Sequence, residues 1–479
     1  MLSLHSDHRS QDAIEVADKV NAGEITKESV LEITRALIDK ENPQYNAVVD
    51  LVDRPITSDT TQNMGGRLNG VPFLIKELGT YGEGLFYREG SARSAKNAAR
   101  SKRSSNLVNR LKGSGAVLIG STSTSEFGLE ARTEPEAFGA VMHPWKSGRS
   151  TGGSSGGSAT AVARGWVPFA HATDGAGSIR LPAAFCGVIG LKPSRGRISF
   201  GPSIGETLGL FATNFFLTRS IRDTALLLDI VSGGLPGDYV AQLDHQNIDW
   251  LTVVEREGSE PLSKFSIGLS FSLPKESPKV DSNIEETILK IARSLEISGH
   301  KIDTIESWIF GTSQTQEDFE IAWYAMAAES VRRVGGFGEG IEEYSEYLAK
   351  LGESISAGQL AESLGRLTRL GRFVESKIFG NFDLLMTPVC PVIPPVLLSE
   401  TRLDPKARIR ESLDTLLPFT YGVNVLGYPA ISLPLRTPVE NEPCGLQIIA
   451  RMGREDLLLR LSRQLELLDL IELSPLVVR

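Results

Sequence analysis

Residues 149–195 constrain the fold more than any other part of the chain. They contain two clusters of glycine and serine, GGSSGGS at 152–158 and DGAGS at 174–178. Between the clusters the sequence has a helix pattern built from small residues and then an apolar strand pattern. Because glycine permits sharp turns and leaves its N–H group bare, we expect two tight turns joined by a helix and a strand.

The second cluster is suited to acyl-transfer chemistry. Consecutive bare N–H groups form a concave anion site, and a helix N-terminus strengthens it. A serine at the end of such a run can attack a carbonyl while the N–H groups hold the developing oxyanion. The pattern therefore predicts that Ser178 is a nucleophile.

From Arg149 to Lys192 the chain is similar to the amidase signature family, whose Gly/Ser-rich segment ends in a D-x-G-G-S-x-R block. Family members use a serine nucleophile, a second serine after a cis peptide bond, and a lysine. By position, the resemblance implies that Ser178 is the nucleophile and Ser154 the cis serine. The lysine is Lys76, which ends the apolar run VPFLIK.

The resemblance also implies an oxyanion hole made by the backbone N–H groups of Gly175, Ala176, Gly177 and Ser178. Ala176 departs from the family, which usually has glycine there. If this position needs a positive φ, alanine costs about 1–2 kcal/mol. If φ is negative, the substitution is harmless.

Three further residues are expected to support the site. Asp174 and Arg180 flank the nucleophile, and we predict structural roles for them as a helix cap and an ion-pair partner. Ser155 follows the cis serine directly.

Lys76 can act as a base only when it is neutral. Its ordinary pKa is about 10.4, so burial and hydrogen bonding must lower that pKa by several units. A single lysine at the end of an apolar strand is a setting that can do this.

Candidate substrate-binding residues come from loops that resemble family segments around the pocket. The loop at 122–146 contributes Phe127, and the segment PFTYGVNVLG contributes Asn424. Gly152 opens the first cluster, and Trp323 is half of an aromatic pair that fits a core position or a groove wall.

The fold class expected is α/β, with one large domain spanning residues 1–479. Its core is a mixed, mostly parallel twisted β-sheet covered by helices on both faces. The signature core is placed at about 65–240, and a helical elaboration that sets specificity at about 280–420.

Hydrophobic periodicity locates the elements. Helices are expected at 10–22, 27–41, 104–112, 155–164, 223–231, 282–297, 315–333, 358–378 and 455–468. Strands are expected at 45–52, 71–76, 116–120, 167–172, 264–269, 382–387, 430–433 and 446–450. Residues 53–68 read as a polar loop.

Three local patterns have other interpretations. The run at 147–158 also fits a flexible Gly/Ser linker. Ser154 also fits the G-x-S-x-G nucleophile elbow, with His171, His245 and His300 downstream, but no strand precedes it. Ser272 and Lys275 fit an S-x-x-K pattern that is short enough to arise by chance.

Composition excludes several classes of protein. The net charge of −9 does not favour nucleic acid or an anionic membrane surface. Three cysteines without C-x-x-C spacing predict neither a disulfide framework nor a zinc site. The polar N-terminus and the absence of an 18-residue apolar run predict a cytoplasmic protein without a membrane span.

The main hypothesis is a hydrolase of a small amide, and also of aryl esters or carbamates, that needs no metal or organic cofactor. The segments TEPEAFGA, HPW and GREDLLL resemble stand-alone bacterial amidases of the nylon-oligomer and xenobiotic-amide type, and a homodimer is compatible with that resemblance. The alternatives are the glutamine-hydrolysing subunit of a tRNA-dependent amidotransferase and a non-catalytic binding protein on the same fold.

Overall fold

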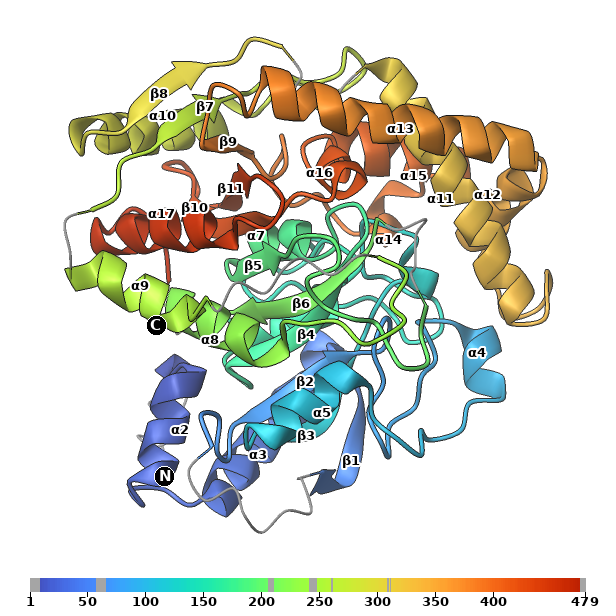
Figure 1. The fold of residues 1–479 in the computed structure, drawn as a ribbon. Coiled ribbons are helices and arrows are strands. Elements are labelled where there is room, and N and C mark those ends of the chain that lie inside the picture. The colour runs from blue at the N-terminus through green and yellow to red at the C-terminus, as the bar shows by residue number, and fades with distance from the viewer. Residues whose placement is uncertain are drawn as a thin grey trace.

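A computed structural model describes residues 9–56, 66–205, 211–240, 248–259, 262–307, 310 and 312–473. These residues form one 11-stranded sheet with helices packed around it (Figure 1). Of the loop expected at 53–68, residues 53–56 continue the first strand, and 57–65 lie outside the described residues.

The sheet extends from β1 at the bottom of Figure 1 to β8 at the top, in the order β1-β3-β2-β4-β6-β5-β10-β11-β9-β7-β8. Its strands are β1 (Val48–Ile56), β2 (Pro72–Lys76), β3 (Val117–Thr122), β4 (Phe169–Asp174), β5 (Ile189–Lys192), β6 (Thr213–Thr218), β7 (Ser266–Leu269), β8 (Lys301–Thr304), β9 (Leu384–Pro388), β10 (Ala430–Arg436) and β11 (Pro443–Ala450).

The sheet is mixed, as expected, but the prediction that it is mostly parallel is wrong. Only β2 with β3, β2 with β4, β7 with β9 and β7 with β8 pair in parallel among the described strands. The other neighbours are antiparallel. A short connection can reverse the chain between antiparallel strands, as between β10 and β11, whereas a parallel pair needs a longer crossover.

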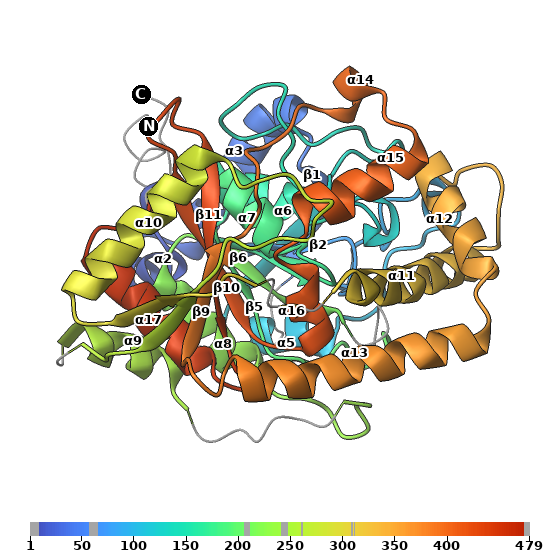
Figure 2. The same ribbon diagram turned by 90° about the horizontal axis from the view of Figure 1, so that it is seen from above.

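The central strands lie between two layers of helices. Strands β2, β4, β6 and β11 are buried along their whole length, as expected for strands that are covered on both faces. Helices α7 (Arg180–Cys186) and α17 (Glu455–Leu467) both pack on β10 and β11, from opposite sides of the sheet (Figure 2). Helices therefore cover both faces of the sheet, as expected.

The remaining helices surround this sheet or extend from it. They are α2 (Ala13–Asn21), α3 (Lys27–Tyr45), α4 (Ala92–Lys96), α5 (Asn106–Gly113), α6 (Gly156–Ala163), α8 (Ile221–Val231), α9 (Trp250–Ser259), α10 (Ser282–Ile297), α11 (Ser313–Arg333), α12 (Glu343–Glu353), α13 (Ala357–Lys377), α14 (Leu398–Thr401), α15 (Pro405–Arg410) and α16 (Tyr421–Leu426), with short turns η1 (Glu126–Gly128) and η3 (Glu411–Leu416).

Strong periodic patterns located their elements well, and weak patterns did not. Helix α10 has the bounds predicted, because Asp281 caps it and its apolar positions face the sheet. The strand expected at 45–52 begins later, since α3 continues to Tyr45 and Asn46 ends it in a left-handed conformation. Strands β6 and β8 and helices α9 and α12 were not predicted.

Residues 280–420 form a layer built mainly on α11, which packs against α12 and α13. Their buried side chains make a second apolar cluster, separate from the main core. Strands β8 and β9 fall within the same range but belong to the sheet, and α10 packs into the main core. The specificity role of this layer stays a prediction.

No helix in the described ranges combines the length and apolarity needed to cross a membrane. The three cysteines, Cys186, Cys390 and Cys444, are buried and not joined in disulfides.

Candidate active site

The first glycine and serine cluster forms a buried turn that leads into α6. The peptide bond between Gly153 and Ser154 is cis. A side chain at Gly153 would collide with the backbone of Arg132, so this close approach requires glycine. Residues 151–163 are all buried, and the flexible-linker interpretation is therefore wrong.

Strand β2 places Lys76 at its carboxyl end, with no exposed surface. The Nζ atom lies 2.6 Å from Ser154 Oγ and 2.8 Å from Thr173 Oγ1. Burial lowers the pKa of Lys76 well below its ordinary value, although the nearby Asp174 carboxylate opposes the shift. A lysine in this setting can be neutral at a pH where an exposed lysine is charged.

Thr173 is a residue of the site that sequence reasoning missed. It is the last residue but one of β4, which lies beside β2 in the sheet, and its hydroxyl accepts a hydrogen bond from Lys76. Ser155 holds this strand end, because its Oγ donates to the Thr173 carbonyl at 3.3 Å and accepts from the Thr173 N–H at 3.4 Å. Ser155, a predicted supporting residue, thus contacts the lysine's partner.

We expect Thr173→Val to lower kcat/KM by about 10- to 100-fold, because a hydrogen bond to a charged group contributes about 1.5–3 kcal/mol. The hydroxyl stabilises the ammonium form of Lys76, so its loss lowers the pKa of Lys76 further. The acid limb of the pH–rate profile should therefore move to lower pH. Thr213→Val is the control, since Thr213 Oγ1 is buried without a hydrogen-bond partner; an equal effect in both variants would contradict this role.

Ser178 lies in a loop between β4 and α7 and is partly exposed, in contrast to the buried Ser154. The backbone N–H groups of Gly175, Ala176, Gly177 and Ser178 donate no hydrogen bond to any described residue. Four donors of this kind beside an accessible hydroxyl can hold a developing negative charge.

The backbone of this loop accommodates Ala176 without strain. Ala176 is not among the described non-glycine residues with positive φ, so its methyl group costs nothing in backbone conformation. The positive value belongs to Gly177, at 139°, where an added side chain would collide with Thr420. Thr420 Oγ1 also donates to the Ala176 carbonyl at 2.6 Å, which fixes the loop.

A buried ion pair anchors the loop from below. Arg180 donates to both carboxylate oxygens of Asp174, at 2.9 and 3.0 Å, and neither side chain is exposed. Burial by itself raises the pKa of Asp174, but the charge and hydrogen bonds of Arg180 outweigh it and lower the pKa to about 2. Arg180 also bonds Gln447 at 2.6 Å, and Asp174 Oδ2 accepts from the Ile179 N–H at 3.2 Å.

We expect Arg180→Leu to destabilise the fold by about 3–5 kcal/mol, because it leaves the Asp174 carboxylate buried without a counter-ion. The folded pKa of Asp174 is about 2 and the unfolded value about 3.9. The pair's stabilisation is thus present above about pH 4 and lost as pH falls toward 2.

Urea unfolding at pH 7 and at lower pH measures both effects. The control is Arg332→Leu, which breaks an exposed pair with Glu353 and should cost less than about 1 kcal/mol. A cost below 1 kcal/mol for Arg180→Leu would contradict the anchoring role.

Ser178 opens onto two cavities. The larger has a volume of about 590 Å³ and is also lined by Ser154, Thr173 and Phe127. The smaller, about 20 Å³, is lined by Trp323 among others. Gly128, Gly175 and Ser178 line both.

Two of the four candidate substrate-binding residues, Phe127 and Trp323, thus lie on cavity walls. Gly152 has a positive φ of 71°, and a side chain added there would meet Leu181 and Phe185 of α7. Asn424 is fully buried, where it donates to the Asp174 carbonyl at 2.8 Å and accepts from Arg180. Neither Gly152 nor Asn424 lines these cavities, and Asn424 instead belongs to the support of the loop.

The far wall of the larger cavity carries an ion pair that sequence reasoning also missed. Arg333 at the end of α11 donates to both oxygens of Glu89, at 2.8 and 2.9 Å. Glu89 and Phe127 both have positive φ, 56° and 52°, and the Phe127 N–H donates to the Glu89 carbonyl at 2.8 Å. Strained non-glycine residues cluster at functional sites.

The nucleophile-elbow interpretation finds no support in the histidines. His171 Nε2 bonds Asn214 at 3.2 Å, and His300 Nε2 bonds Gln464 at 2.8 Å. Burial lowers the pKa of His171 to about 3, so it is neutral, while His245 lies outside the described residues. The S-x-x-K pair at Ser272 and Lys275 does not line either cavity at Ser178.

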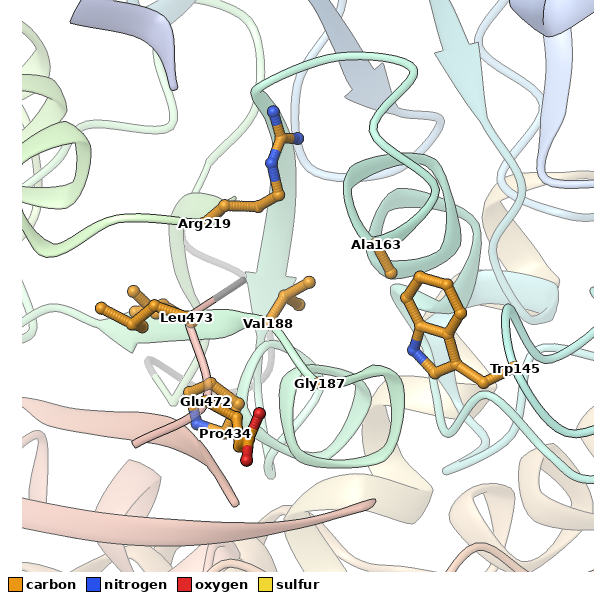
Figure 3. Close-up of a pocket in the computed structure, with 9 residues that line it drawn as sticks. Trp145, Ala163, Gly187, Val188, Arg219, Pro434, Glu472 and Leu473 are labelled. Atoms are coloured by element: carbon orange, nitrogen blue, oxygen red, sulfur yellow. The ribbon is translucent and has the colours of Figure 1, made fainter. Parts of the chain in front are cut away.

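A further small pocket, drawn in Figure 3, has neither Ser154 nor Ser178 among its lining residues. Trp145, Val188 and Leu473 are among its lining residues, and its volume is about 10 Å³. This is room for about one water molecule, so the pocket is not a substrate site.

Comparison with known proteins defines the class of protein. Residues 32–459 match the family described as Amidase. The 6-aminohexanoate-cyclic-dimer hydrolase of Paenarthrobacter ureafaciens is 34% identical over 471 residues, covering 95% of this chain and 94% of that protein. A putative amidase, AmiC, of Mycobacterium bovis is 31% identical with the same coverage.

A solved structure supports the same relationship. The structure of 6-aminohexanoate cyclic dimer hydrolase complexed with substrate has a TM-score of 0.88 and 32% identity, covering 98% of both chains. The chain belongs to the amidase signature family. It is a hydrolase that acts on carbon–nitrogen bonds, on an α/β fold with a mixed sheet.

Proposed function

We propose that this chain hydrolyses small-molecule amides through an acyl-enzyme on Ser178, with Ser154 and Lys76 as the proton relay. The observation that carries the proposal is the 2.6 Å contact between Lys76 Nζ and Ser154 Oγ. It lies at the wall of the cavity onto which Ser178 also opens. Family membership supports the same roles.

In the first step, the Ser178 Oγ attacks the amide carbonyl carbon. Its proton passes to Ser154, while the Ser154 proton passes to the neutral amine of Lys76. The N–H groups of the 175–178 loop hold the oxyanion, and each such donor typically lowers the barrier by about 3–4 kcal/mol. Return of a proton through Ser154 to the amide nitrogen allows the C–N bond to break.

In the second step, water replaces the amine. The relay takes a proton from the water as its oxygen attacks the acyl carbon, and Ser178 leaves with a proton returned by Ser154. By microscopic reversibility the same groups serve both steps. The products are a carboxylic acid and an amine.

The cavity size limits the substrate class. A volume of about 590 Å³ is in the range of sites that enclose drug-sized molecules, about 300–1,000 Å³. Aryl amides, aryl esters and carbamates (urethanes) fit this volume and the same chemistry, and so does an amide of the nylon-oligomer type that the relatives' names indicate.

The test is a hydrolysis panel of matched aryl amides, aryl esters and carbamates, the cyclic dimer of 6-aminohexanoate, and glutamine. We expect turnover of at least one amide or carbamate by the wild type and none by Ser178→Ala. Ammonia release from glutamine alone would favour the amidotransferase-subunit alternative. Equal turnover by the wild type and the variant would contradict the proposal.

A further inference from the structure

The larger cavity at Ser178 is charged on the wall formed by the end of α11. The charged side chains among its described lining residues are Glu89, Glu329 and Arg333. Glu329 and Arg333 lie four residues apart at the end of this helix, and Glu89 comes from the loop between β2 and α4. Two carboxylates thus accompany one guanidinium, and the wall has a net negative charge.

The guanidinium of Arg333 is already engaged by the two carboxylates. Its two terminal nitrogens donate to Glu89, at 2.8 and 2.9 Å, and its Nε atom lies 3.4 Å from Glu329 Oε1. Burial by itself lowers the pKa of Arg333, but the hydrogen bonds and charge of Glu89 outweigh it and raise that pKa. A cation is therefore stabilised at this wall, and an anion is not.

The two carboxylates differ in exposure. The Glu89 side chain is 5% exposed, whereas the Glu329 side chain is 65% exposed. A carboxylate can accept about four hydrogen bonds, and the 3.4 Å contact with Arg333 occupies only one oxygen of Glu329. Glu329 therefore keeps acceptor capacity for a further donor at a place that solvent and substrate both reach.

The backbone of α11 contributes to the same field. The helix ends at Arg333, and its last-turn residues Ser330 and Arg333 line the cavity. The C-terminus of a helix carries the negative end of its dipole, which stabilises a nearby cation and disfavours an anion.

One substrate can contact both the serines and this wall. Ser154 and Ser178 line the same cavity of about 590 Å³, which is large enough to enclose a drug-sized molecule. An amide with its carbonyl carbon at Ser178 can therefore place a remote group beside Glu329. That group meets hydrogen-bond acceptors and negative charge, which are the partners of an ammonium group.

We propose that this enzyme prefers amides that carry an ammonium group remote from the scissile bond, and that Glu329, supported by Glu89, determines this preference. This inference rests on the proposed function. It names a class of substrate within the small amides, namely amides of amino acids or diamines whose free amine is protonated.

The direct test compares substrates that differ only in terminal charge. One set is p-nitroanilides whose acyl chain ends in an ammonium, a methyl or a carboxylate group. The other is acetamides whose amine chain ends in the same three groups. Each is made with three, five and seven methylene groups in the chain. We expect kcat/KM for the ammonium substrate to exceed that for the carboxylate substrate by at least about 10-fold in one set.

Variants of Glu329 test which residue sets the ratio. Glu329→Gln should lower the ammonium-to-carboxylate ratio of kcat/KM by about 5-fold, and Glu329→Lys should lower it further. The matched control is Glu317→Gln, because Glu317 is an exposed carboxylate on the same helix that lines neither cavity at Ser178. Glu329 is exposed, so both of its variants should fold, and urea unfolding checks this.

Salt dependence distinguishes a charge effect from a structural one. The Debye length falls from about 30 Å at 0.01 M ionic strength to about 8 Å at 0.15 M. The ratio in the wild type should therefore fall over this range, and it should change less in Glu329→Gln. A structural role of Glu329 would leave the ratio independent of salt.

The outcomes separate this inference from the proposed function. Equal turnover of the three terminal groups in both sets, or a preference for the carboxylate, overturns the charge assignment while the serine mechanism stands. An equal change of ratio in Glu317→Gln and in Glu329→Gln also overturns it. No turnover of any amide, ester or carbamate contradicts the proposed function and this inference together.

Discussion

Ser178→Ala is expected to lower kcat by about 10⁴- to 10⁶-fold on any amide that the wild type hydrolyses, since loss of a serine nucleophile has effects of this size. In the proposed mechanism, the variant removes the oxygen atom that bonds to the acyl group. The anchoring ion pair of Asp174 and Arg180 and the bond from Thr420 to the Ala176 carbonyl are untouched. Its midpoint of urea unfolding should therefore match that of the wild type.

The measurement combines steady-state turnover with labelling by a fluorophosphonate probe. Mass spectrometry should place the label on Ser178 in the wild type and find none in the variant. Ser330→Ala is a matched control, because Ser330 lines the same cavity without contacting the relay. Labelling of another serine, or turnover retained in Ser178→Ala, would contradict the assignment of the nucleophile.

Lys76→Met is expected to lower kcat/KM by about 10³- to 10⁴-fold and to remove the acid limb of the pH–rate profile, because general-base catalysis contributes factors up to about this size. In the wild type, Lys76 accepts a proton only when neutral, so the rate should rise with pH through the lowered pKa of Lys76 and then level. In the variant no group takes the Ser154 proton, and the rise should disappear.

A second buried lysine provides the control for this prediction. Lys192 is also fully buried, and burial lowers its pKa well below the ordinary value. Its Nζ donates to the Pro193 carbonyl at 2.9 Å and contacts neither serine. Lys192→Met should therefore keep the acid limb, and a profile that is flat from pH 5 to 9 in the wild type would exclude Lys76 as the base.

The two lysines show what local sequence can and cannot distinguish. Both end short apolar strands, β2 and β5, and both are buried. The resemblance to the amidase signature family singled out Lys76, but nothing in the local pattern did so. The difference arises from strand order, because β2 lies next to β4 and its end thus meets Thr173 and the Ser154 turn.

Several residues of the site depend on contacts across the chain that no local signal indicates. Thr420 and Gln447 support the nucleophile loop from more than 200 residues away. Arg333 pairs with Glu89 at a sequence separation of 244 residues. The local sequence does not distinguish such a threonine or glutamine from any other, because its role depends on packing against distant residues.

The sequence by itself determined the chemistry and the local geometry that it needs. Gly177 has a positive φ, which is a local requirement of the backbone, whereas Gly153 permits a close approach to the Arg132 backbone. The order of serine clusters, helix and strand indicated the family and the residues Lys76, Ser154 and Ser178. The buried face of α10 could be predicted from the spacing of its apolar residues, because helix amphipathicity depends only on residues that are close in the sequence.

Only the tertiary structure decided the strand directions, the partners of Lys76 and the shape of the cavities. Strand pairing joins segments far apart in the chain, and its direction depends on how the connections pack. A cavity is what remains after side chains from many elements have filled space, so Phe319, Trp323 and Leu417 become one wall only in the folded chain. The amide-hydrolysing chemistry is thus readable from a short stretch of sequence, whereas the choice of substrate is a property of the packed whole.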